Sequence, residues 1–164
     1  RQIGALAAGL LLALAAGFGL GRWSGIGDGR VEQEVVAAHV RSLQADHLVD
    51  VASSDRHTVK PWFAGKVDFA PIVADFAKEG FTLVGGRLDY LDGRPSAALV
   101  FKRREHTINV FLQPRRDGTS YTPRASERQG FHLLHAVVDG FDCWLISDIG
   151  DADLRELLHL VGSI

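Results

Sequence analysis

The chain has 164 residues, which suffices for one compact domain and one additional segment. It contains 18 Lys and Arg against 20 Asp and Glu, and every acidic residue follows Arg22, so a basic face for nucleic acid is not expected. The only cysteine, Cys143, excludes an intramolecular disulfide, and its place in a predicted strand indicates a buried, unreactive thiol.

The first segment is predicted to be a single membrane-spanning helix over residues 1–23. Residues 3–21 carry no charged or polar side chain, and a helix of that length is about 28 Å long, close to the ~30 Å hydrocarbon core of a bilayer. A signal-peptide core or a buried globular helix is the alternative, but the run exceeds a signal core and lacks a small-residue cleavage motif. Because the sequence contains no methionine, we expect it to begin inside a longer protein.

A flexible linker is predicted over residues 24–30, where glycine and turn-forming residues predominate, followed by a globular domain over residues 31–164. From Val31 to Val51 hydrophobic residues recur at spacings of three and four, which predicts a helix close to the membrane. Its expected apolar stripe consists of Val36, Val40, Leu43, His47 and Val51.

Reactive residue types are concentrated in the next stretch, SSDRHTVKPWFAGKVDF, over residues 53–69. Lys60 precedes Pro61, so we expect extended backbone there, and Trp62 and Phe63 are large enough to anchor a loop on the sheet. The same stretch contains the residue types of a hydrolase triad, but no nucleophile elbow motif accompanies them. The triad types are Ser54, Asp55 and His57. We therefore predict no enzymatic activity.

Five strands in neighbouring antiparallel pairs are predicted further along the chain. They cover residues 81–91, 96–103, 106–114, 130–138 and 141–149. Asp-Gly steps separate two of these pairs and favour tight hairpin turns.

Two helices are predicted around these strands: a short one from Pro71 that ends at Gly80, and one over residues 151–161 with an apolar stripe at helical spacing. The polar residues 114–128 are expected to form a surface loop. The predicted fold class is α+β, a small antiparallel-sheet domain with flanking helices after the membrane helix.

The seven histidines invite a metal-site interpretation, which their spacing does not favour. His132 and His135 lie three apart on a predicted strand and therefore face opposite sides of the sheet. His39 and His47 are about two helical turns apart, and no cysteine pair or metalloprotease motif supports them. Surface or packing roles are the preferred interpretation, and a metal or proton sensor is the alternative.

Three segments together resemble transmembrane anti-sigma factors of Gram-negative bacteria, which regulate extracytoplasmic-function sigma factors. They read SSDRHTVKPWFAGKVDFAP, GFTLVGGRLDYLDGRPSAALVFKRREHTINVFLQP and GFHLLHAVVDGFDCWLISDIGDADLREL. The resemblance covers residues 37–160 in the same order, after a single membrane helix.

This resemblance implies a cytoplasmic sigma-binding domain that would precede the present sequence and that holds a zinc ion in some members. The present chain would then be the anchor in the bacterial inner membrane and a periplasmic domain, with no cofactor of its own. Implied partners are the sigma factor, the inner membrane, and either a periplasmic signalling protein or a second copy of the chain. A periplasmic metal-binding or protein-interaction domain unrelated to sigma control is the alternative.

The residues that carry the resemblance are our candidates for a recognition surface or a structural signature; none is predicted to be catalytic or to bind metal. They are His57, Lys60, Pro61, Trp62, Phe63, Gly85, Gly86, Asp89 and Tyr90.

Overall fold

The computed structural model describes residues 29–52, 56–116 and 122–164, and only the backbone of residues 56 and 57. The membrane-spanning helix predicted over residues 1–23 and the first part of the predicted linker lie outside these ranges, as do Ser54 and Asp55. Within the ranges that are described, no helix is long and apolar enough to cross a membrane.

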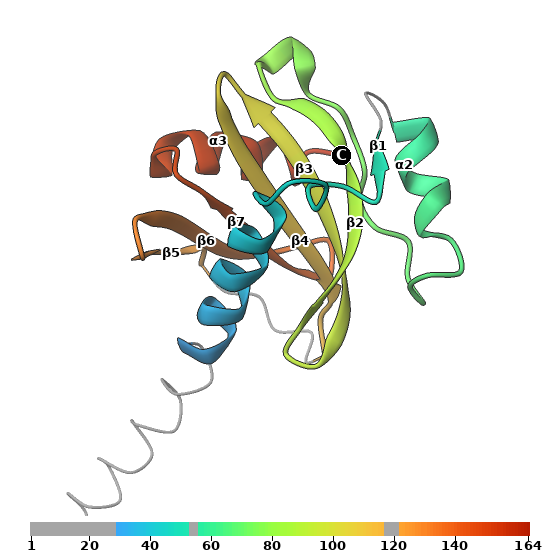
Figure 1. The fold of residues 1–164 in the computed structure, drawn as a ribbon, viewed down its shortest axis with the longest axis horizontal. Coiled ribbons are helices and arrows are strands. Elements are labelled where there is room, and N and C mark those ends of the chain that lie inside the picture. The colour runs from blue at the N-terminus through green and yellow to red at the C-terminus, as the bar shows by residue number, and fades with distance from the viewer. Residues whose placement is uncertain (1–28, 53–55, 117–121) are drawn as a thin grey trace, which may run out of the picture.

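A seven-stranded antiparallel sheet forms the centre of the domain, in the order β1-β2-β3-β4-β7-β6-β5 (Figure 1). Its strands are β1 (Val51–Ala52), β2 (Thr82–Leu91), β3 (Arg94–Arg103), β4 (His106–Pro114), β5 (Arg124–Arg128), β6 (Phe131–Val138) and β7 (Phe141–Ser147). Two three-stranded meanders, β2-β3-β4 and β5-β6-β7, join where β4 pairs with β7. The sheet and its flanking helices confirm the predicted α+β class.

The hairpin turns follow from the sequence as predicted. Asp92 and Gly93 between β2 and β3 both have positive φ, 50° and 68°, as do Asp139 and Gly140 between β6 and β7, at 48° and 79°. Glycine adopts this backbone region without strain and aspartate tolerates it better than most residues, so Asp-Gly steps close two-residue hairpins.

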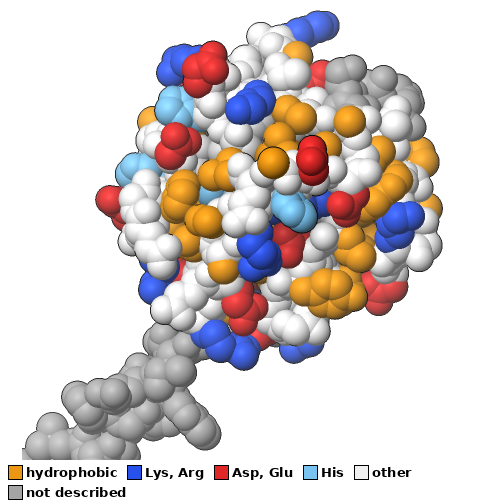
Figure 2. Space-filling model, in the orientation of Figure 1, with side chains coloured by type: hydrophobic (Ala, Val, Ile, Leu, Met, Phe, Trp, Pro, Cys, Tyr) orange, Lys and Arg blue, Asp and Glu red, His pale blue; other side chains and the backbone are white. Residues whose placement is uncertain are grey.

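Helices cover both faces of the sheet. One face packs against α2 (Arg56–Phe63) and α3 (Asp151–Val161), with the rings of Phe63, Phe81 and Phe101 fully buried in the core between them. The other face carries the helix of residues 29–42, which lies in front of the sheet in Figure 1. Basic, acidic and apolar side chains are interspersed over this side of the molecule (Figure 2).

The helix of residues 29–42 is shorter than the helix predicted up to Val51, and of its predicted buried stripe Val36 is buried whereas Val40, Leu43 and His47 are exposed. Residues 29 and 30, assigned to the linker, are already helical. Val40 and Leu43 are exposed at 41% and 49%. Turns follow the helix because Asp46 adopts a positive φ of 62°, and Val51 then pairs with Gly86 in the sheet. The side chains that the helix buries are Val35, Val36, Ala38, His39 and Ser42.

Three further expectations are corrected. Lys60 and Pro61 lie within α2 rather than in extended backbone. We attribute this to the burial of Val59 and Phe63, one helical turn apart, which offsets the cost of a proline inside a helix. The helix predicted from Pro71 is reduced to a 3-10 turn, η1 (Ala77–Glu79). Part of the predicted loop 114–128 is strand β5, and the two-residue β1 was not predicted.

Candidate functional site

Glu32, in the first turns of the helix of residues 29–42, fastens that helix to strand β5. One carboxylate oxygen of Glu32 accepts a hydrogen bond from the hydroxyl of Ser126 at 2.9 Å, and the other pairs with Nη2 of Arg128 at 3.1 Å. Both strand residues project from the same face of β5, since they are two positions apart. The carboxylate therefore links the helix to one edge of the sheet.

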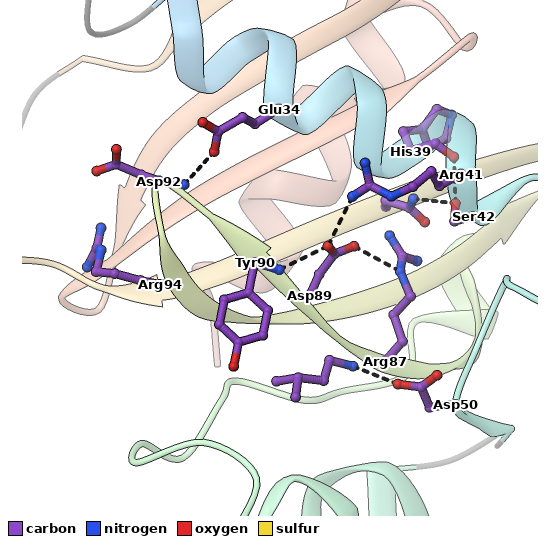
Figure 3. Close-up of polar contacts among 12 residues, drawn as sticks. Glu34, His39, Arg41, Ser42, Asp50, Arg87, Asp89, Tyr90, Asp92 and Arg94 are labelled. Atoms are coloured by element: carbon purple, nitrogen blue, oxygen red, sulfur yellow. Dashed lines mark hydrogen bonds and ion pairs between the residues drawn. The ribbon is translucent and has the colours of Figure 1, made fainter.

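The same part of the helix is also fastened to the β2–β3 turn at the other side of the sheet. Glu34 accepts a hydrogen bond from the backbone N–H of Asp92 at 2.6 Å (Figure 3). The Asp92 carboxylate also pairs with Arg30. Elements far apart in the strand order thus meet one short stretch of helix, which requires the sheet to curve around it.

Nearer the end of the helix, Asp89 of β2 lies between two guanidinium groups (Figure 3). Its oxygens are 3.2 Å from Nε of Arg87 and 3.5 Å from Nη2 of Arg41, which projects from the helix. Arg87 also donates to the carbonyl oxygen of Leu48 at 3.3 Å and stacks over the ring of Phe111 at 5.4 Å. We call Arg41, Arg87 and Asp89 the docking triad.

Arg87 is the buried member of the docking triad, so its charge depends on the neighbouring carboxylate of Asp89. Arg87 is only 5% exposed, and burial lowers its pKa while the neighbouring Asp89 opposes that shift. Nη2 of Arg87 is buried without a hydrogen-bond partner among the described residues. A buried ion pair of this kind adds little net stability, but the loss of one partner is costly.

His39 occupies the interface between helix and sheet. It is 1% exposed, its ring meets Phe131 edge-on at 4.9 Å, and its Nδ1 has no hydrogen-bond partner among the described residues. Burial, reinforced by the positive charge of Arg87, lowers the pKa of His39 to about 4, while Asp148 acts in the opposite direction. His39 is therefore neutral near pH 7.

One turn further, Ser42 completes the contact with the middle of the sheet. Its hydroxyl donates to the carbonyl oxygen of His39 at 2.7 Å and accepts from the side-chain amide of Asn109 at 2.8 Å. Both side chains are almost fully buried. This interaction sets the distance and rotation of the helix relative to β4.

Four of the signature residues, Gly85, Gly86, Trp62 and Phe63, fall into two packing groups. Gly85 lies beneath β1, where a Cβ would come within 2.2 Å of the carbonyl oxygen of Val51. Gly86 lies beneath α2, against the fully buried ring of Phe63. Trp62 is half-buried, meets Phe63 edge-on at 5.2 Å and has Nζ of Lys66 over its ring at 4.6 Å.

The remaining signature residues lie apart from this packing contact. Asp89 belongs to the docking triad, whereas Tyr90 is 59% exposed and points away from the helix of residues 29–42 (Figure 3). Lys60 and Pro61 are exposed on α2, and His57 is in the first turn of α2, where only the backbone is described. The expectation that Trp62 and Phe63 anchor this stretch to the core is confirmed, although the stretch is a helix.

The other predicted packing features can also be placed. Cys143 is fully buried in β7, and burial together with Asp142 raises its pKa to about 12. His135 stacks flat on Trp144, with centroids 3.9 Å apart. Burial alone would raise the pKa of Asp142, but hydrogen bonds from His135 and Arg115 hold it below its ordinary value.

No three His, Cys, Asp or Glu residues in the described ranges come together as a group that would hold a metal ion. Sequence reasoning missed the roles of Arg41, Arg87, Ser42 and Asn109. Arg87 and Asp89 alternate with apolar residues along β2, which indicated a polar face, but nothing in the sequence indicated that a helix covers it.

Comparisons with protein-family models, with curated proteins and with solved structures found no match for this chain.

Proposed function

We propose that this chain is the membrane-anchored periplasmic sensor portion of an anti-sigma factor that restrains an extracytoplasmic-function sigma factor. The proposal draws on the resemblance of residues 37–160 to that family and on the arrangement of the domain. The helix of residues 29–42 follows the predicted membrane segment after a short predicted linker and is fastened to the sheet along its length.

The docking triad is the observation that carries this proposal. A signal is transmitted only if the domain has two states and the stimulus binds one of them better. In the docked state Arg87 and His39 are buried beneath the helix, and Asp89 is partly buried. In a released state these groups would be hydrated again, so the desolvation of the ion pair and of His39 would no longer count against that state. This reduces the free-energy difference between the docked and released states.

In this scheme the sheet domain responds to a stress or to a partner, the helix changes its docking, and the predicted membrane helix passes the change to a cytoplasmic sigma-binding domain. The topology is then a single pass through the bacterial inner membrane with the C-terminal domain in the periplasm. The domain itself works as a regulator and not as an enzyme.

The test uses the full-length protein and a reporter driven by the cognate sigma factor. Deletion of residues 24–164 is expected to change basal repression or to abolish the stress response. Arg41→Gln, which removes the helix side of the docking triad, is expected to shift the same output without unfolding the domain, because Arg41 is largely exposed.

The matched control is Asp151→Asn, which breaks the exposed pair between Asp151 and Arg155 on α3, far from the helix of residues 29–42 in sequence. It should leave the reporter unchanged. An unaltered basal level together with an unaltered response after the deletion would refute the sensing role. A normal response in Arg41→Gln alone would refute the docking triad as the route.

A further inference from the structure

Residues 60–71, which include the signature residues Lys60 and Pro61, form an open apolar groove. α2 and the chain that follows it enclose a hollow of about 560 Å³, formed entirely by residues between Lys60 and Pro71. Its lining residues are Lys60, Pro61, Ala64, Val67, Asp68, Phe69, Ala70 and Pro71. Lys60, Pro61 and Ala64 are exposed, so the hollow opens to solvent.

The groove is held open by the fold and continues along the surface. Gly65, with a φ of 78°, turns the chain back after α2, and Phe69 is fixed against Phe141 with the ring centroids 5.7 Å apart. A second hollow of about 300 Å³ shares Asp68 and Phe69 with the first and extends toward the β3 and β4 ends of the sheet. Together we call them the signature groove.

Positive side chains with no ion-pair partner among the described residues lie along this groove, on a chain whose net charge is −2. Lys60 is exposed at one end, and Arg94 and Arg116 line the other. Arg94 donates to the carbonyl oxygen of Pro114, and its Nε is buried without a hydrogen-bond partner among the described residues. Of the described residues that line it, Asp68 is the single carboxylate, so the signature groove favours an acidic occupant.

We propose that the signature groove binds a peptide segment of a partner protein, with an apolar side chain beside Phe69 and carboxylates facing Arg94 and Arg116. A small molecule usually has most of its surface buried by its pocket, whereas this groove is open along one side and continues past Phe69. An extended peptide can occupy both hollows at once, because they share Asp68 and Phe69. The effect of peptide binding in the cell rests on the proposed sensing role. Peptide binding itself can be measured independently of that role.

The experiment measures fluorescence polarisation with the full chain in nanodiscs. The probe is a labelled peptide, Val-Phe-Val-Asp-Glu-Asp, and the comparison peptide carries Lys-Arg-Lys in place of its acidic residues. We expect saturable binding of the acidic peptide, at least about tenfold tighter than that of the basic one.

Two variants test the location of binding, and one serves as control. Ala64→Trp fills the first hollow from an exposed position, and Arg116→Glu reverses a charge at the second. Each is expected to weaken binding about tenfold or more. Lys78→Glu makes the same charge change at an exposed residue of η1 outside the groove and should bind as the unaltered chain does. Circular dichroism of all three verifies that they are folded.

Several outcomes overturn the proposal: no saturable binding, equal binding of both peptides, or equal losses in Lys78→Glu and Arg116→Glu. Octanoate that competes as strongly as the peptide would show that the groove takes a small apolar acid instead. If the peptide binds but deletion of residues 24–164 leaves the reporter unchanged, the sensing role is refuted and the peptide-binding groove is not. If the deletion changes the reporter but no peptide binds, only the peptide-binding groove is refuted.

Discussion

The ring of Phe63 lies directly against the backbone of Gly86. A Cβ on this glycine would come within 3.0 Å of Cε2 and Cζ of Phe63 and within 2.9 Å of Cγ1 of Val59. The contact joins α2 to the middle of β2 and brings together the two most distinctive parts of the signature. It also explains why a glycine is suited to an extended strand that would otherwise favour a larger side chain.

Gly86→Ala is therefore expected to destabilise the domain. The added methyl group must displace a fully buried ring and a fully buried valine, so we expect the free energy of unfolding to fall by about 1–3 kcal/mol. Urea denaturation followed by tryptophan fluorescence measures the change. Gly29→Ala is the control, because the nearest atom to its Cβ would be 3.9 Å away, and it should be neutral or slightly stabilising.

Removal of the charge of Asp89 should cost more than removal of the whole buried pair. In Asp89→Asn the 5%-exposed Arg87 loses its nearest carboxylate, and we expect a loss of about 3 kcal/mol in the free energy of unfolding. In the double variant Arg87→Met and Asp89→Asn, no buried charge remains unpaired, and part of the loss should be recovered. A double-mutant cycle from urea denaturation measures the coupling. Strictly additive losses would show that the two side chains do not interact.

Stability should fall as the pH decreases from about 6.5 to about 4, because of His39. In the unfolded chain this histidine binds a proton near its ordinary pKa of 6.5, whereas burial lowers its pKa in the folded state to about 4. The unfolded state thus binds more protons throughout this window, and about 3 kcal/mol of stability is lost across it. Denaturation midpoints recorded at several pH values measure the slope.

His39→Gln should flatten that slope, and His159→Gln, at an exposed position on α3, should leave it unchanged. Arg87 and Asp148 are the charged groups that act on His39. Burial would raise the pKa of Asp148, but hydrogen bonding with His106 holds it below its ordinary value of 3.8, so this carboxylate keeps its charge within the window. An unchanged slope in His39→Gln would assign the acid sensitivity to other groups.

Cys143 should react with thiol reagents only when the domain unfolds. Its side chain is fully buried, and its pKa of about 12 leaves almost no thiolate near neutral pH. We expect labelling by Ellman's reagent at the rate of unfolding, and rapid labelling in denaturant. Ala64→Cys, at an exposed position, provides a second thiol that should react at once in the folded protein. Rapid labelling of Cys143 without denaturant would contradict the buried position.

Local sequence patterns were sufficient for β2, β3, β4, β6 and β7 and for α3, but not for β1 and β5. The Asp-Gly steps encode turns within a few residues of the strands that they join, and α3 has the predicted bounds because Leu154, Leu157 and Val161 form one helical stripe. These features depend on neighbours in the sequence, so they need no knowledge of the tertiary fold.

The missed features depend on contacts between distant residues. The apolar period continues past Ser42 into Val51, but Val51 pairs with Gly86, and this sheet contact replaces the last turns of the predicted helix. The docking triad joins Arg41 to Asp89 across 48 positions, and no local pattern relates them. Lys60 and Pro61 suggested extended backbone because the burial of Phe63 beneath α2 was not visible in the sequence.

The helix of residues 29–42 bridges the two meanders of the sheet. Glu32 holds it to β5 of one meander, whereas Glu34 and Ser42 hold it to the β2–β3 turn and β4 of the other. A twist between the meanders about the β4–β7 seam would therefore pull these anchors in different directions. Under the proposed sensing role, a stimulus that distorts either meander would therefore act on the contacts of this one helix.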